Sequence, residues 1–434
     1  MFGYYLELAL RSLRRSRALT VLMILAIALG IGASMTTLTV LHVLSGDPLP
    51  GRSGSIFMPR LDPRGLRGFD LSVDLPAQVT WTDGMNLLNA RRAHRQALMT
   101  GGAVPIQPDD PSIDPFFVSA RYTSADFFGM FDTPFRYGQA WSATEDEQRA
   151  HIAVIGAELN DRLFHGENSV GRTIRANGAD MRIVGVLKPW RPVPHFYDLN
   201  TTNYGAAEQV FVPLTTSRAM RLTRNGGVEC WGMGSGDEEH MESASCVWLQ
   251  LWVELDDAAA VASYRTFLEG YAREQVASGR YDRPARAELT DVMHLLDEQQ
   301  VVPGDVRLQV WLSLGFFAVC LVNTVGLMLA KFMRRAGEVS VRRALGASRR
   351  SVFTQLLTEA GMVGLAGGFG GLAVALLGLA IVRMQPNPAA ELAHLDLTML
   401  AATFLISLLA ALAAGLLPAW RACRIPPALQ LKSQ

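Results

Sequence analysis

The sequence predicts a membrane protein with four transmembrane α-helices and a large mixed α+β extracytoplasmic domain between the first and the second helix. The first observation is that four runs lack Asp, Glu, Lys and Arg: Thr20–Leu44, Leu308–Ala330, Ala360–Val382 and Leu397–Trp420. Each run is long enough to cross a hydrocarbon core of about 30 Å, which takes about 20 helical residues. The second observation is that the segment between the first two runs alternates strand-like and helix-like patterns.

Basic residues gather on one side of these runs. Residues 1–44 and 307–434 hold 16 Lys and Arg against 5 Asp and Glu, whereas residues 45–306 hold 24 against 35. Segments rich in Lys and Arg stay in the cytoplasm. We therefore expect a multi-pass membrane protein with both termini in the cytoplasm. Because the whole chain is neutral, its charge does not indicate a nucleic-acid partner.

These patterns divide the chain into nine segments. In chain order they are 1–19 (amphipathic cytoplasmic helix), 20–44 (first transmembrane helix), 45–306 (extracytoplasmic domain), 307–331 (second transmembrane helix), 332–352 (cytoplasmic segment), 353–383 (third transmembrane helix), 384–396 (short external loop), 397–420 (fourth transmembrane helix) and 421–434 (cytoplasmic tail).

Local signals support an α+β domain at 45–306. His151–Gly156 reads as a strand, and the residues after it read as a helix that ends near Gly166. Thr173–Leu187 reads as two strands around an Asn-Gly turn, which is a strong hairpin signal. Val247–Leu255 alternates as a strand does. A helix should follow it to about Ala277, capped by one of two adjacent aspartates, before a strand at 287–290.

Three further expectations concern the first half of this domain. Ser124 can cap a short helix at Asp126–Phe131, because its hydroxyl can accept from the backbone of the first turn. The Pro-rich segments Asp47–Pro63 and Ile106–Pro115 read as irregular connections.

Cys230 and Cys246 fall in the predicted external domain, in a Gly-rich and acidic loop. An oxidising compartment allows them to form a disulfide. We expect this bond in preference to two unpaired thiols, since the loop has little else to order it.

No motif indicates an enzyme. The sequence contains no G-x-x-x-x-G-K-[ST] loop, no H-E-x-x-H and no G-x-S-x-G. The cluster Glu238–Glu242 reads as a solvated acidic loop better than as a metal site. We therefore predict no catalytic residue, no metal and no cofactor bound by this chain.

The four runs carry small residues instead of ionisable ones. Small residues that recur every four positions let helix backbones approach closely. They serve either packing within one subunit or dimerisation, and the sequence leaves both open. The residues are Ala26, Gly30 and Ser34 in the first run and Gly364, Gly367, Gly368 and Gly371 in the third.

The segment Glu338–Gly346 reads as a short amphipathic helix that ends at its glycine. Val341 and Leu345 share one face, whereas Glu338 and Arg342 lie toward another. Positive charge alone would suffice to fix topology, so this ordered pattern favours a docking element for a cytoplasmic partner. In that role the apolar pair would enter a cleft, and Glu338, Arg342 and Arg343 would set the register.

The stretch "GEVSVRRALGASRRSVFTQLLTEA" resembles the segment between the second and third spans of FtsX-like and MacB-like ABC permeases, where the pattern is close to E-I-G-I-R-R-A-L-G-A. Ser340 departs from it, since the family usually has Gly there. "HIAVIGAELNDRLFHGENSVGRTIRANGADMRIVGVLKPW" resembles the external core domain of the same family. "LALRSLRRSRALTVLMILAIALGIG" and "LLPAWRACRIPPALQLK" extend the likeness over essentially the whole chain.

The resemblance implies a permease subunit of the bacterial inner membrane. It would pair with a dimer of separate ATPase subunits, which carry ATP and Mg, and with a second permease chain, identical or related. It implies that residues 332–352 couple to the ATPase and that ATP hydrolysis moves the external domain. The work done there would be export or extraction of a substrate. The alternative is a transmembrane regulator of a periplasmic partner enzyme such as a cell-wall hydrolase. Participation of a periplasmic adaptor and an outer-membrane channel stays open.

Overall fold

The computed structural model describes residues 2–424 except 68–69, 71–72, 109, 232–239 and 386–396. The chain forms two compact units, one made of Met1–Ser45 with Val302–Gln434 and the other of Gly46–Val301. The predicted loop 384–396 and tail 421–434 fall mostly outside the described residues.

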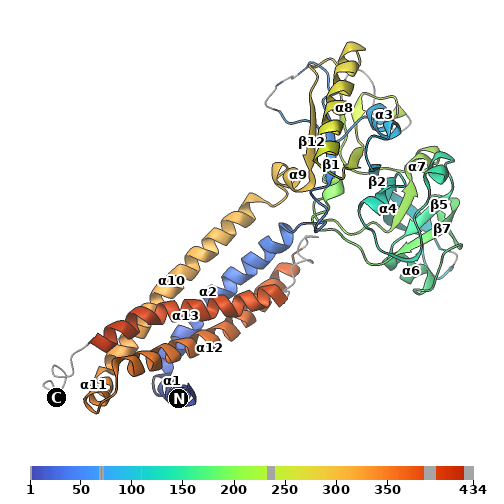
Figure 1. The fold of residues 1–434 in the computed structure, drawn as a ribbon. Helices are drawn as coiled ribbons and strands as arrows, with labels where there is room; N and C mark the ends of the chain where they lie inside the picture. The colour runs from blue at the N-terminus through green and yellow to red at the C-terminus, as the bar shows by residue number, and fades with distance from the viewer. Residues whose placement is uncertain are drawn as a thin grey trace. The chain divides into compact units, whose positions relative to one another are not determined.

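The first unit is helical (Figure 1). Four of its helices are long and apolar enough to cross a membrane, which confirms the predicted fold class. Its helices are α1 (Phe2–Arg15), α2 (Arg17–Leu44), α10 (Gly304–Arg334), α11 (Ala336–Ala344), α12 (Arg349–Arg383) and α13 (Leu397–Arg424). The predicted third span begins earlier than expected, because Ser348 caps α12 by accepting from the backbone N–H of Ser351 at 3.1 Å.

The core of the helical unit lies along one stripe of α2. Met23, Ile27, Ile31 and Met35 recur every four residues, so they share one helix face, and each is almost fully buried. Their neighbours come from α10, α12 and α13 and include Met328, Phe332, Val352, Leu356, Ala360, Val363 and Ala411.

The small residues singled out in the sequence pack within the chain. A Cβ on Gly364 would lie 2.4 Å from the Cβ of Ala411 on α13, and one on Gly367 would lie 2.5 Å from Ile27 of α2. Both distances are shorter than real carbon contacts, so only glycine lets α12 approach both helices. The other members behave alike: Gly368 faces α13, Gly371 faces α2, Gly30 and Ser34 face α10, and Ala26 is half-buried.

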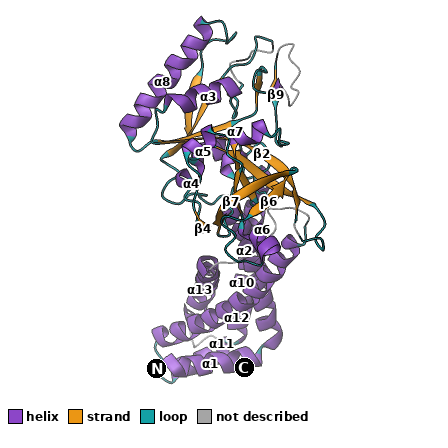
Figure 2. Ribbon diagram, turned by 90° about the vertical axis from the view of Figure 1, so that its right-hand side faces the viewer, coloured by secondary structure: helices purple, strands orange, loops and turns teal. Residues whose placement is uncertain are grey.

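The second unit is a mixed α+β domain (Figure 2). Its sheet has the order β12-β1-β11-β2-β3-β8-β5-β7-β4, with β6 pairing with β2 and β7. Most pairs are antiparallel, but β3 with β8 and β5 with β7 are parallel. The strands are β1 (Ile56–Leu61), β2 (Arg95–Gln107), β3 (Phe116–Thr123), β4 (Phe135–Gly138), β5 (Ile152–Ile155), β6 (Thr173–Ala176), β7 (Ala179–Leu187), β8 (Val210–Pro213), β11 (Gln250–Glu254) and β12 (Ala287–Asp291).

Helices cover the two ends of this sheet. Figure 1 shows α3 and α8 beside the end that carries β1 and β12, and α6 beside β5 and β7. The helices are α3 (Trp81–Ala90), α4 (Phe127–Met130), α5 (Ala143–Glu147), α6 (Ala157–Phe164), α7 (Leu214–Ala219), α8 (Ala258–Ala277), α9 (Val292–Glu298) and the 3₁₀ turn η1 (Phe196–Asp198).

Several local predictions are confirmed. β6 and β7 form the expected hairpin, and Asn177 and Gly178 both have positive φ, as its turn requires. α6 ends just before Gly166, which also has positive φ. Asp257 caps α8 by accepting from the backbone N–H of Ala260 at 2.7 Å.

Three local predictions are wrong. The segment Asp47–Pro63 contains the strand β1. On one side β1 pairs with β12 along its length, including Pro59, and on the other side only Ile56 and Phe57, which precede the proline, pair with β11. Ile106 begins no irregular connection, because β2 continues to Gln107. Ser124 does not cap α4: its hydroxyl accepts from the N–H of Leu98 and donates to the carbonyl of Gln96, so it joins β2 instead.

The loop that holds the two external cysteines is closed by a short hairpin. β9 (Glu229–Cys230) pairs with β10 (Cys246–Val247), and this register places the two cysteines opposite each other. Their sulfurs are joined at 2.00 Å. Residues 232–239 of the loop, which include the first part of the acidic cluster, lie outside the described residues.

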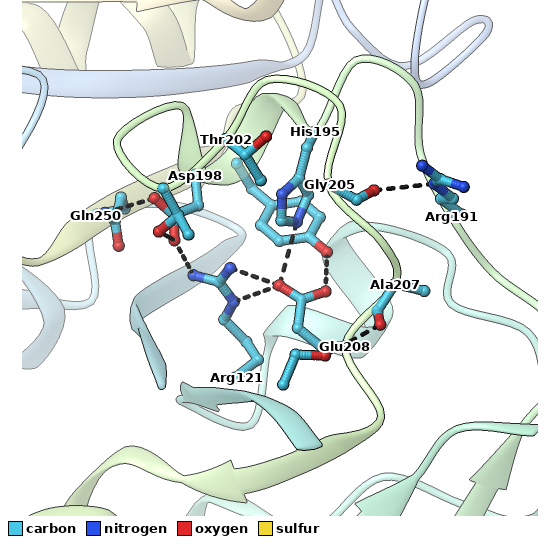
Figure 3. A network of polar contacts seen from close by, with 12 residues as sticks. Arg121, Arg191, His195, Asp198, Thr202, Gly205, Ala207, Glu208 and Gln250 are labelled. Atoms are coloured by element: carbon cyan, nitrogen blue, oxygen red, sulfur yellow. Dashed lines mark hydrogen bonds and ion pairs between the residues drawn. The ribbon is translucent and has the colours of Figure 1, made fainter. Parts of the chain in front are cut away.

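A buried polar network fixes the segment between β7 and β8 onto the sheet (Figure 3). Arg121 of β3 donates to Asp198 at 2.7 Å and to Glu208 at 3.0 Å. Glu208 also accepts from the hydroxyl of Tyr197 at 2.7 Å and lies 3.1 Å from His195. Burial acts to raise the pKa of Glu208, but the charges of Arg121 and His195 and these hydrogen bonds hold it far below the ordinary value.

Candidate functional site

The best-defined candidate site is α11, the short helix between α10 and α12. Its end is closed by two hydrogen bonds: the N–H of Gly346 donates to the carbonyl of Arg343 at 3.2 Å, and that of Ala347 to Arg342 at 3.1 Å. Gly346 has a φ of +99°, which an L side chain rarely adopts. This is the Schellman arrangement, and it turns the chain sharply from α11 into α12.

The charged side chains of α11 bond to their own chain. Arg342 donates to Gln355 of α12 at 2.9 Å, and Arg343 donates to the backbone carbonyl of Cys423 on α13 at 3.1 Å. Glu338 pairs with Arg15 of α1 and accepts from Arg335 at 3.2 Å. From the sequence we expected these three charges to face a partner, whereas the structure uses them to hold α11 against the surrounding helices.

Two apolar side chains at the end of α11, Val341 and the C-cap residue Leu345, are exposed, whereas Val339 packs against the core of the helical unit. Leu345 is 83% exposed and Val341 is 49% exposed. The helix α11 lies at the same end of the helical unit as α1 (Figures 1 and 2). These two side chains therefore leave an apolar surface at the end of α11 that the described part of the chain does not cover.

A buried charge cluster lies behind α11, where the sequence reading found none. Glu359 of α12 is 1% exposed and Lys331 of α10 is 2% exposed, and the two form an ion pair. The hydroxyl of Ser12 donates to Glu359 at 2.6 Å, and Arg335 lies 3.4 Å from the same carboxylate. Lys331 also donates to Thr20 of α2 at 3.2 Å.

The view that the spans lack buried charge is therefore wrong at this end of the unit. Both residues lie directly beside the uncharged runs, Lys331 after the second and Glu359 before the third. A signal was available: an ionisable residue inside the membrane is usually paired, and Lys331 at the end of another run is a cation that could pair with Glu359. The cluster joins α1, α2, α10 and α12 directly behind α11.

Within the described ranges, no group of three or more His, Cys, Asp or Glu is arranged to hold a metal ion. The arrangement provides a helix with an exposed apolar end whose charged side chains bond to α1, to the C-cap residue of α10, to α12 and to α13.

Comparison with known families covers most of the chain. The model of the MacB-like periplasmic core domain matches residues 20–270, and that of the FtsX-like permease C-terminal domain matches residues 310–427. The chain belongs to the FtsX/MacB-like family of ABC transporter permeases. It is thus a multi-pass protein of the bacterial inner membrane with a MacB-like domain between its first two spans.

Curated relatives of this permease are exporters. It is 24% identical over 345 residues to the pyoverdine export ATP-binding/permease protein PvdT of Pseudomonas entomophila, covering 77% of this chain and 45% of the relative. It is 25% identical over 454 residues to the macrolide export ATP-binding/permease protein MacB of Rhodospirillum rubrum, covering 100% of this chain and 61% of the relative. The permease spans about half the length of the curated relatives it matches.

A solved structure, the periplasmic region of MacB from Actinobacillus actinomycetemcomitans, also resembles the permease. The match has a TM-score of 0.37 and 11% identity, and it covers 59% of this chain and 96% of that one. At this TM-score it adds nothing to the family assignment, which rests on the two domain models.

Proposed function

We propose that this permease receives the motion of an ABC ATPase through α11 and converts it into motion of its extracytoplasmic domain, driving export or extraction of a substrate on the external side. The observation that carries the proposal is the polarity of α11, whose charged groups bind its own chain while Val341 and Leu345 are exposed. A displacement of such a helix is passed to the spans, because its charged side chains are already attached to them.

The proposal assigns the partners as follows. The ATPase, with its ATP and Mg, is on another chain and acts as a dimer, and a second permease chain completes the membrane part. Both termini and α11 lie in the cytoplasm. The printed names of the relatives are those of exporters, which favours export over regulation of a periplasmic enzyme such as a cell-wall hydrolase.

The change that tests the docking role is Leu345→Asp. Complete burial of a leucine contributes about 1.5–3 kcal/mol, so replacing it by a charge should weaken the ATPase complex by at least tenfold. The substitution keeps every Arg in place, so topology is retained. We expect the variant to insert normally but to lose co-purification with the ATPase and to lose transport-coupled function.

Two controls accompany this variant. Leu345→Met keeps an apolar side chain of similar volume and should bind the ATPase as the parent does. Leu66→Asp places the same charge on an exposed leucine of the external domain, 62% exposed, and should leave ATPase binding unchanged. Normal ATPase capture and normal activity in Leu345→Asp would refute the docking role of α11.

A further inference from the structure

A basic cavity opens beside the start of α2, and Ser12, Lys331 and Arg335 of the charge cluster form part of its lining. Its volume is about 470 Å³, within the usual range for sites that hold small molecules. Its walls come from the end of α1, the start of α2, the end of α10 and the start of α11. The lining residues are Ser12, Arg15, Ser16, Arg17, Ala18, Leu19, Lys331, Arg334, Arg335 and Glu338.

The cavity carries an excess of positive charge. Five of its lining residues are Lys or Arg and one is Glu. Glu359, which pairs with Lys331 and Arg335 from behind, is the second carboxylate in contact with this group. The net charge of the seven side chains is therefore +3, and an anion in the cavity would relieve their mutual repulsion.

The backbone adds to this field. α2 has 28 residues and begins at Arg17, and Ser16 makes no side-chain hydrogen bond to its first turn. The hydroxyl of Ser16 instead lies 3.4 Å from the carbonyl of Ser12. The positive end of the α2 dipole therefore faces the cavity without a capping group, and Ala18 and Leu19 of its first turn form part of the wall.

An exposed apolar stripe leads away from the cavity along the same helix. Leu22, Leu25 and Leu29 are 53%, 50% and 49% exposed. They follow Ala18 of the cavity wall at intervals of four, three and four residues, so all four share one face of α2. Acyl chains can lie against this stripe while their headgroup occupies the cavity, whereas a free anion would use the cavity alone.

We propose that this cavity binds the phosphate headgroup of an anionic phospholipid whose acyl chains lie along Leu22, Leu25 and Leu29. Arg17 and Arg334 supply charge at the cavity wall, and the start of α2 supplies backbone donors. The bound lipid belongs to the leaflet on the side of α1 and α11, the cytoplasmic leaflet in the expected topology. This assignment does not depend on the role of α11 in ATPase docking.

The test uses the full chain purified in detergent and titrated with phosphatidylglycerol or phosphatidylcholine, with bound lipid counted by native mass spectrometry. We expect one tightly retained phosphatidylglycerol per chain and no retained phosphatidylcholine. The double variant Arg17→Gln/Arg334→Gln should weaken phosphatidylglycerol binding about 30-fold, at about 1 kcal/mol for each lost cation. Arg349→Gln/Arg350→Gln removes the same charge from the start of α12, outside the cavity, and should change binding less than threefold.

A third variant keeps the charge and fills the space. Ala18→Phe should lower phosphatidylglycerol retention with every cation in place, which guards against misfolding of the charge variants. Equal retention of both lipids, or equal phosphatidylglycerol binding in all variants, overturns the proposal. Displacement of phosphatidylglycerol by equimolar inorganic phosphate would assign the cavity to a free anion and overturn the lipid. Loss of ATPase capture in Arg17→Gln/Arg334→Gln with unchanged lipid binding would assign the surface to the ATPase instead.

Discussion

Replacing Arg121 by methionine is the sharpest test of the extracytoplasmic domain. Arg121 is 1% exposed and is the guanidinium shared by Asp198 and Glu208. Methionine fills similar volume but leaves two buried carboxylates without that cation. Breaking a buried ion pair on one side costs about 3–5 kcal/mol.

The expected shift in melting temperature follows from the size of the unit. In a domain of this length, each kcal/mol of lost unfolding free energy lowers the melting temperature by about 2–4 °C. The variant Arg121→Met should therefore melt about 6–20 °C below the parent. Tryptophan fluorescence of the full chain can follow the transition, because the indole of Trp252 donates to the carbonyl of Tyr197 within the network. Arg136→Met is the matched control: its pair with Asp161, at 3.4 Å, is exposed and should contribute at most about 1 kcal/mol. A loss of less than about 2 °C in Arg121→Met would contradict the reasoning.

The acid side of the same network gives an independent readout. The pKa of Glu208 is lower in the folded state than in the unfolded state. Its ionised form therefore stabilises the fold fully above the ordinary carboxyl pKa, and this stabilisation is lost as the pH falls towards the pKa of the folded state. The parent should therefore lose stability on acidification below about pH 4.5. The variant Glu208→Gln should lose less stability over this pH range. If stability depends on pH identically in the two proteins, Glu208 is not ionised in the folded state.

Two further predictions concern other parts of the chain. Burial raises the pKa of Asp146 to about 6, although hydrogen bonds from Thr215 act to lower it. Because the folded pKa exceeds the unfolded one, the contribution of Asp146 to the free energy of unfolding declines as pH rises from about 4 to 6. The variant Asp146→Asn should therefore have a free energy of unfolding up to about 3 kcal/mol higher than the parent at pH 7.5, and little higher at pH 4. Thermal unfolding at the two pH values measures this, and an equal effect at both would contradict the prediction. Gly364→Ala should destabilise the contact of α12 with α13 by about 1–3 kcal/mol in a detergent denaturation series. Gly326→Ala on α10, where a Cβ meets nothing within 4 Å, should be neutral or stabilising, and equal effects of the two changes would disprove the packing role.

Local sequence signals predicted those elements whose cause is local. Four uncharged runs suffice for four spans, the Asn177-Gly178 pair suffices for a hairpin, and Gly346 suffices for the end of α11, because each needs only its own few residues. The strand β1 was missed for the opposite reason. Pro59 argues against a strand, and the partner that makes β1 possible, β12, lies more than 200 residues away in the chain.

The candidate site shows the same limit. The helical spacing of Val341 and Leu345 predicted an apolar face that enters a partner's cleft, but it did not show the direction in which the charged side chains of α11 point. That direction is set by the partners of the charged residues, Gln355 and the carbonyl of Cys423, which are distant in sequence. Spacing within one helix carries no information about such contacts.

The connected charges behind α11 also affect how mutational data on this end of the protein should be interpreted. Arg335 contacts both Glu338 and Glu359, and Glu359 is shared with Lys331 and Ser12. Substitutions of groups that share partners have strongly non-additive effects on stability. In a scan of single substitutions, the loss of one shared interaction would therefore be counted at each of its partners. Epistasis is therefore the expected genetic behaviour here, and a second change that removes the opposite charge should restore much of what the first one costs.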